Sequence, residues 1–155
     1  LIIFLSIPFS GLWVWLDRRR IEPSSPFKFA MGLANLSVGF LMLYAGAKQA
    51  ETSGKSALIW LILGYFFHTT GELCLSPVGL STITKLAPAR LVGMFMGVWF
   101  LATALGNVLA PKVAGVQESQ SFGNVFLRIA MIAAGGSVLL LVLVRPLKRM
   151  MHGVK

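Results

Sequence analysis

The sequence predicts an all-α, polytopic membrane protein, on the strength of its composition and its hydropathy pattern. Hydrophobic residues make up 56% of the 155-residue chain and charged residues only 12%, whereas soluble domains carry about 25% charged residues. The mean hydropathy is +0.79. The apolar residues are gathered into long segments, each close to the length of about 20 residues that a membrane-spanning helix needs. We therefore expect helices that cross a lipid bilayer, joined by polar loops.

The first apolar segment, residues 1–16, ends in Trp13 and Trp15, and tryptophan favours the membrane–water interface. The chain starts at Leu1, within this apolar run and without an initiating Met. We therefore expect a truncated span and a C-terminal fragment of a longer protein.

Four further spans are expected within a single transmembrane domain over residues 1–155. One of them is rich in small residues, which let membrane helices approach closely. Another contains the one acidic residue that lies inside an apolar segment. A third lies between Pro88 and Pro111, and the last precedes a basic tail. In chain order the spans are 27–47, 57–84, 91–109 and 124–144.

The distribution of Lys and Arg predicts the orientation, because basic residues are enriched in cytoplasmic loops. Ten basic residues lie on the side of the first loop and the C-terminus, and three lie on the opposite side. The ten are Arg18, Arg19, Arg20, Lys28, Lys85, Arg90, Arg145, Lys148, Arg149 and Lys155; the three are Lys48, Lys55 and Lys112. We expect a cytoplasmic C-terminus. The net charge is +9, but the basic residues lie in short clusters between apolar segments and form no continuous basic face. We therefore expect no nucleic-acid partner.

Glu72 is the first candidate functional residue, because it is the only acidic residue between Glu51 and Glu118. A carboxylate inside a membrane span is costly and usually marks an ion or substrate pathway. Helical spacings of three and four place it on one polar stripe, which should face protein or a water-filled cavity. The stripe comprises Tyr65, His68, Thr69, Glu72 and Ser76. Four of the members also have a plain structural interpretation: an ion pair for Glu72, a hydrogen-bonded core position for His68, and helix–helix contact for Tyr65 and Thr69.

Pro77 and Gly79 follow directly on this stripe and are candidate gate or hinge residues. Proline removes a backbone donor, and broken helices in transporters bend around binding sites. In the next span, Trp99, Thr103 and Asn107 fall on one helical face. Trp99 is mid-span, away from the interfaces, so we interpret this face as a cavity wall, with core packing as the alternative.

No enzyme site is predicted. The two histidines are isolated, Cys74 is the single cysteine, and the sequence has no HExxH, G-x-S-x-G or Walker motif. Neither a metal site nor ATP-driven transport is expected from these residues.

The residues from Trp60 to Ala110 resemble the proton-dependent oligopeptide transporter (POT) family. The resemblance is carried above all by three runs, GELCLSPVGLS (71–81), TKLAP (84–88) and MGVWFL (96–101). It implies helices 8 (partial) to 12, the C-terminal bundle of a major facilitator fold. It also implies that Glu72 binds the peptide amino terminus, that Ser76 and Trp99 line the same site, and that the hairpin with Pro77 and Gly79 belongs to a cytoplasmic gate.

By this resemblance the expected function is proton-coupled symport of di- and tripeptides across a bacterial inner membrane. The proton gradient is the driving force and no cofactor is expected; the missing N-terminal bundle of the same protein is an expected partner. One alternative is a relative that transports another small solute. The other is a membrane scaffold subunit without transport activity, in which a partner helix would cover the Glu72 stripe.

Overall fold

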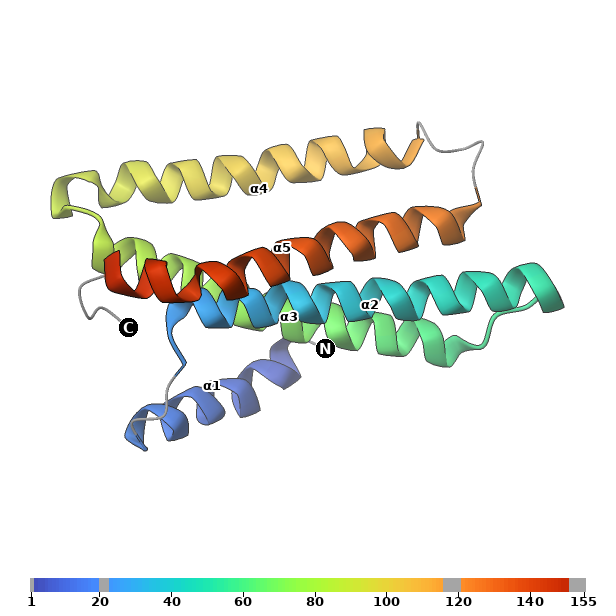
Figure 1. The fold of residues 1–155 in the computed structure, drawn as a ribbon, viewed down its shortest axis with the longest axis horizontal. Helices are drawn as coiled ribbons and strands as arrows, with labels where there is room; N and C mark the ends of the chain where they lie inside the picture. The colour runs from blue at the N-terminus through green and yellow to red at the C-terminus, as the bar shows by residue number, and fades with distance from the viewer. Residues whose placement is uncertain (1, 20–22, 116–120, 151–155) are drawn as a thin grey trace.

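The structure, a computed structural model, describes residues 2–19, 23–115 and 121–150, and its regular elements in this part of the chain are all helical. The predicted all-α fold class is therefore confirmed. Within the described residues, four helices are long and apolar enough to cross a membrane, and the helix before them is shorter. In chain order the elements are α1 (Ile2–Arg18), α2 (Ser25–Ser53), α3 (Leu58–Leu86), the 3-10 turn η1 (Ala89–Leu91), α4 (Val92–Gly115) and α5 (Phe122–Met150) (Figure 1).

The helices extend beyond the spans expected from hydropathy. α2 runs on to Ser53, so most of the segment expected as a loop after residue 47 is helical. It ends at Gly54, whose backbone φ of 69° is left-handed and whose N–H bonds the carbonyl of Ala50 at 2.9 Å. Similarly, α4 continues past Pro111 to Gly115. Hydropathy marks only the apolar part of a helix, and polar turns can extend it on either side.

α2 and α5 are antiparallel and pack through small residues. Two buried hydrogen bonds tie them: Ser37 Oγ donates to the carbonyl of Ala130, and Ser137 Oγ donates to the carbonyl of Ala30, each at 2.8 Å. On both helices the bonding positions are seven residues apart, which is about two turns. Ala30 and Ala130 are each 1% exposed. Small side chains bring the two backbones close enough for a serine hydroxyl to reach across.

Replacing Ser137 by Ala is expected to lower the stability of the protein by about 0.6 kcal/mol, and by no more than about 1.7 kcal/mol, the range measured for hydrogen bonds between membrane helices. The carbonyl of Ala30 also bonds within its own helix, so it is not left entirely unsatisfied. Thermal unfolding of the detergent-solubilised protein measures the change. Ser10→Ala is a matched control, because Ser10 is exposed and bonds only the carbonyl of Ile7 in its own helix. Equal destabilisation by both substitutions would contradict this account.

α2 and α3 pack through glycines that receive side chains of the opposite helix. Gly32, Gly39 and Gly46 of α2 recur every seven residues, and each contacts an α3 side chain where a Cβ would stand. A Cβ on Gly32 would lie 2.5 Å from Leu75 Cγ, and one on Gly46 would lie 2.9 Å from Trp60 Cβ. The side chain at Gly39 is that of His68. The small residues predicted to allow close helix approach do so at these three positions.

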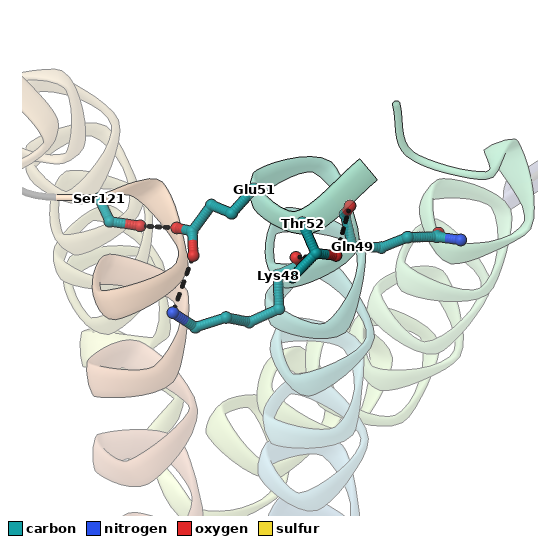
Figure 2. A network of polar contacts seen from close by, with 5 residues as sticks. All are labelled: Lys48, Gln49, Glu51, Thr52 and Ser121. Atoms are coloured by element: carbon teal, nitrogen blue, oxygen red, sulfur yellow. Dashed lines mark hydrogen bonds and ion pairs between the residues drawn. The ribbon is translucent and has the colours of Figure 1, made fainter. Parts of the chain in front are cut away.

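A polar network closes the end of the bundle at Gly54. Figure 2 shows Glu51 between Lys48 and Ser121: Lys48 Nζ lies 2.8 Å from Glu51 Oε2, and Ser121 Oγ donates to Glu51 Oε1. Gln49 joins α2 to α3, because its Oε1 accepts hydrogen bonds from Ala57 N at 3.0 Å and from Trp60 Nε1 at 2.8 Å. The ends of α2, α3 and α5 are therefore held together by side chains of a single α2 turn.

α4 is the least covered of the long helices. Its main contacts are with α3 and η1, and Figure 1 shows it along one side of the bundle, apart from α2. Residues 100–110 are all exposed, and no atom of the described residues outside its own helix lies within 4 Å of a Cβ built on Gly93 or Gly97. α4 therefore meets the other described helices mainly near η1.

Candidate functional site

Glu72 lies on α3 with its side chain exposed, on a part of the helix that the described residues leave open. It makes no hydrogen bond or ion pair with any described residue, so the ion pair weighed as its structural role is not formed within this part of the chain. Cys74, two residues on, is 2% exposed and points into the bundle. α3 thus has a packed side and an open side, and the carboxylate is on the open one.

The other members of the predicted stripe divide between these two sides. Tyr65 is 59% exposed, while Thr69 and Ser76 are partly buried. The hydroxyl of Thr69 donates to the carbonyl of Tyr65 at 2.8 Å. His68 lies at the α2 edge of this face, since its ring contacts Gly39 and Phe40 of α2 and borders a pocket together with Tyr65. The open face therefore carries Tyr65, Thr69, Glu72 and Ser76, and His68 lies at its border with α2.

Pro77 does not interrupt α3, which continues as one helix to Leu86. Its side chain is exposed, and the break expected between Ser76 and Gly79 is absent. A proline within a membrane helix is tolerated where neighbouring groups and local adjustments accommodate the missing hydrogen bond. The gate role of Pro77 remains a prediction, without the broken helix that suggested it.

Gly79 is buried because the indole of Trp99 packs on it. A Cβ on Gly79 would lie 2.8 Å from Cζ2 and from Cζ3 of Trp99 and closer still to Cη2, so only glycine leaves room for the ring. The same ring meets Phe29 of α2 edge to face, with centroids 6.4 Å apart and planes at 78°. Trp99 therefore connects α4 to both α2 and α3.

Trp99 therefore covers the same face of α3 that carries Glu72, but at a different height along the helix axis. Gly79 is seven residues after Glu72, which is about two turns, so the two positions point in nearly the same direction from the helix axis. Trp99 is partly buried by its contact with Gly79. Its packing interpretation thus holds in this conformation, and its role as a substrate contact remains a prediction.

Thr103 and Asn107 follow Trp99 along α4 and are both exposed. The hydroxyl of Thr103 donates to the carbonyl of Trp99 at 2.7 Å. None of the described helices covers these two residues, and their assignment to a cavity wall is a prediction.

Lys28 is a feature that the sequence did not reveal. It was counted among the basic residues of the first loop, yet it lies in the first turn of α2 and is 7% exposed. Its Nζ lies 4.5 Å from the centroid of the Trp13 ring, a cation–π contact. Trp13 also borders a cavity of about 270 Å³ whose polar lining includes Asn35 and Thr70. The proximity of Trp13 to an α2 lysine is a tertiary contact that spacing alone does not predict.

Comparison with known proteins identifies the family. A protein-family model described as the POT family matches residues 1–128. The chain belongs to the POT family. The predicted resemblance is therefore confirmed, and the runs around Glu72 and Trp99 lie inside the matched region.

Named relatives and a solved structure extend this comparison. The peptide transporter YePEPT of Yersinia enterocolitica is 35% identical over 159 residues, which cover 99% of this chain and 31% of YePEPT. Dipeptide and tripeptide permease A of Escherichia coli K12 is 38% identical over 136 residues, covering 81% of this chain and 27% of the permease. A crystal structure of a mutant of the peptide transporter POT in complex with alafosfalin has a TM-score of 0.83 and 35% identity over 98% of this chain and 31% of that one.

The chain thus spans less than a third of the length of these POT-family relatives. All three are named as transporters or permeases, in agreement with the expectation that this chain is not an enzyme. The open face of α3 and the uncovered α4 belong to this shared third of the fold.

Proposed function

We propose that this chain supplies part of a proton-coupled symporter of di- and tripeptides, and that Glu72 binds the amino terminus of the peptide. The observation that carries the proposal is the exposed Glu72 carboxylate, which no described residue neutralises, on a membrane helix of a peptide-transporter family. An ammonium group that leaves water needs a negative partner, because an isolated buried charge is strongly unfavourable. Glu72 is the one carboxylate of the chain inside an apolar segment.

The same carboxylate provides a simple basis for coupling. Within the complete transporter, either a proton or a peptide ammonium group can neutralise the Glu72 carboxylate. Symport requires the proton to cross together with the peptide, so it would be carried on another group while the peptide occupies Glu72 and would reach Glu72 only when the peptide leaves. The proton gradient would then be the source of energy. No cofactor enters this scheme.

The proposed orientation places the end of the bundle at η1 in the cytoplasm of a bacterial inner membrane. Lys85 and Arg90 flank this end, as do Arg18 and Arg145, which agrees with the enrichment of basic residues on the cytoplasmic side. The end at Gly54 would face the outside. The Trp99–Gly79 contact, nearer to η1 than Glu72 is, would then lie on the cytoplasmic side of the substrate.

The proposed partner is the part of the transporter that corresponds to the remaining length of these relatives, which this chain does not cover. Transporters of this class rock one helical bundle against another about a site near the middle of the membrane. The open face of α3, with Ser76 beside Glu72, would form one wall of that site, and Thr103 and Asn107 would extend it.

Competition uptake tests the proposed function. The complete transporter is reconstituted in proteoliposomes with an inward proton gradient, and uptake of a radiolabelled dipeptide is measured. We expect unlabelled di- and tripeptides to compete, and nitrate and single amino acids not to compete. Competition by nitrate or amino acids alone would favour a family relative for another solute, and the absence of any uptake would favour a scaffold subunit.

A further inference from the structure

His68 is a titratable residue that has no role in the proposed peptide site. It lies one helical turn before Glu72 on α3 and is partly buried. Its Nε2 is buried and has no hydrogen-bond partner among the described residues. Such an orphaned polar atom costs about 1–3 kcal/mol, and native proteins keep few of them. An unpartnered imidazole nitrogen inside a helix bundle therefore requires a reason.

The position of the ring is fixed by α2. A Cβ on Gly39 would lie 2.8 Å from His68 Nε2 and closer still to Cδ2, so the imidazole fills the space that this glycine leaves. Phe40 covers the ring, with centroids 4.6 Å apart, and Phe126 of α5 lies 6.3 Å beyond Phe40 by the same measure. These neighbours hold the ring in place but cannot hydrogen-bond it through a side chain.

A pocket of about 300 Å³ borders His68 on the side toward Gly54. It is lined by Leu43 of α2, Leu61 and Tyr65 of α3, and Phe126 of α5. This volume is large enough for several water molecules, each of which occupies about 30 Å³ in the liquid, and Tyr65 and His68 are its polar lining residues. Glu72 is not among the lining residues, so water in this pocket would reach the imidazole without passing the carboxylate.

The ionisable groups around His68 are few. α2 presents Gly39, Phe40 and Leu43 to it and α5 presents Phe126, none of which titrates. Tyr44 of α2 lies against Gly123 of α5 instead. On α3 itself, Tyr65 lines the pocket and Glu72 follows one turn later. Glu72 is therefore the carboxylate nearest to His68 along the helix.

We propose that His68 is a proton-carrying residue that passes protons between this pocket and the carboxylate of Glu72. Residues four apart on a helix are neighbours, with Cβ atoms about 5–6 Å apart, and imidazole gains and loses a proton near neutral pH. The imidazolium loses an N–H proton, the Glu72 carboxylate gains it as an O–H, and the imidazole takes the next proton from water in the pocket. This inference rests on the proposed function and adds a route by which the coupling proton reaches Glu72.

Two transport rates measured on the complete transporter separate proton delivery from peptide binding. Exchange of peptide at equal pH on both sides needs no net proton transfer, whereas gradient-driven uptake does. In His68→Gln, we expect exchange to be retained and gradient-driven uptake to fall at least about tenfold, since a positioned proton-transfer group typically contributes about 100-fold or more to a rate. Glutamine keeps the size and hydrogen-bonding capacity of the side chain but cannot carry the proton. His152→Gln, the other histidine of the chain, is the control and should alter neither rate.

His68→Asn is the second variant, in case glutamine does not fit beside Gly39. Unchanged gradient-driven uptake in either variant overturns the relay, because transport would then not need the imidazole. Equal loss of exchange and uptake in both variants also overturns it, because His68 would then be a packing residue. A wild-type protein that exchanges no peptide overturns the proposed function itself, and the relay with it.

Discussion

Replacing Glu72 by Gln in the complete transporter is expected to weaken binding of a free dipeptide at least about 30-fold, since the loss of one partner of a desolvated charge pair costs about 2 kcal/mol or more. It should also abolish accumulation against a gradient, because an amide cannot exchange a proton. The reason is that Glu72 is exposed on the open face of α3 with no cation of the described chain beside it. Binding is measured by competition uptake and by calorimetry.

An N-acetylated dipeptide sharpens this test, because it lacks the charged amine. The wild type should discriminate strongly against it, and Glu72→Gln should lose most of that discrimination, as a double-mutant cycle requires for a direct contact. Glu51→Gln makes the same chemical change at the end of the bundle near Gly54, where Glu51 pairs with Lys48. It should change peptide affinity by less than about twofold, as expected of an exposed ion pair. Retained discrimination in Glu72→Gln would remove Glu72 from the binding site.

Replacing Gly79 by Ala is expected to displace Trp99 and destabilise the protein by about 1–3 kcal/mol, the usual cost of adding an atom to a packed site. The added Cβ would lie 2.8 Å from two carbons of the indole and closer to a third, and the ring is also held by Phe29. Transport should fall as well, because the indole of Trp99 would no longer pack between α2 and α3. Thermal unfolding and uptake are the two measurements.

Size compensation distinguishes this clash from a general effect of the substitution. Trp99→Leu provides space, so Gly79→Ala should cost much less when it is made in a Trp99→Leu background. Gly135→Ala is the matched control: Gly135 is exposed on α5, and no neighbouring atom in the described part of the chain lies within 4 Å of the position that a Cβ would take. If Gly79→Ala costs the same in both backgrounds, the two side chains are not in contact in the transporter.

The periodicity of the sequence predicted much of the fold, because it follows from how helices bury apolar surface. Hydropathy located the membrane helices, and the three- and four-residue spacing placed Tyr65, Thr69, Glu72 and Ser76 on one face, where the structure has them. Spacing could not decide the direction of His68, which is only about 40° around the helix from Glu72 at 100° per residue. That direction is set by Gly39, a residue of another helix.

The contact between Gly79 and Trp99 could not be predicted from the sequence for a related reason. A glycine next to a proline suggested a flexible break, but the structure uses Gly79 as a surface for a ring from α4. The sequence did contain both residues of the contact, a glycine on one helix and a mid-span tryptophan on the next. Only the crossing of the two helices shows that they form a pair. Hydropathy placed the end of α2 too early, because Lys48 and Glu51 form an ion pair in a further helical turn outside the apolar stretch.

The glycine contacts also constrain how this chain can diverge over evolution. Gly39 and His68, Gly32 and Leu75, and Gly79 and Trp99 each share one volume between two helices. A larger residue at the glycine is compatible with the fold only if its partner has already become smaller. During evolution the large side chain of each pair must therefore be replaced by a smaller one first, and the glycine can change only afterwards. In an alignment of relatives, the two positions would change together.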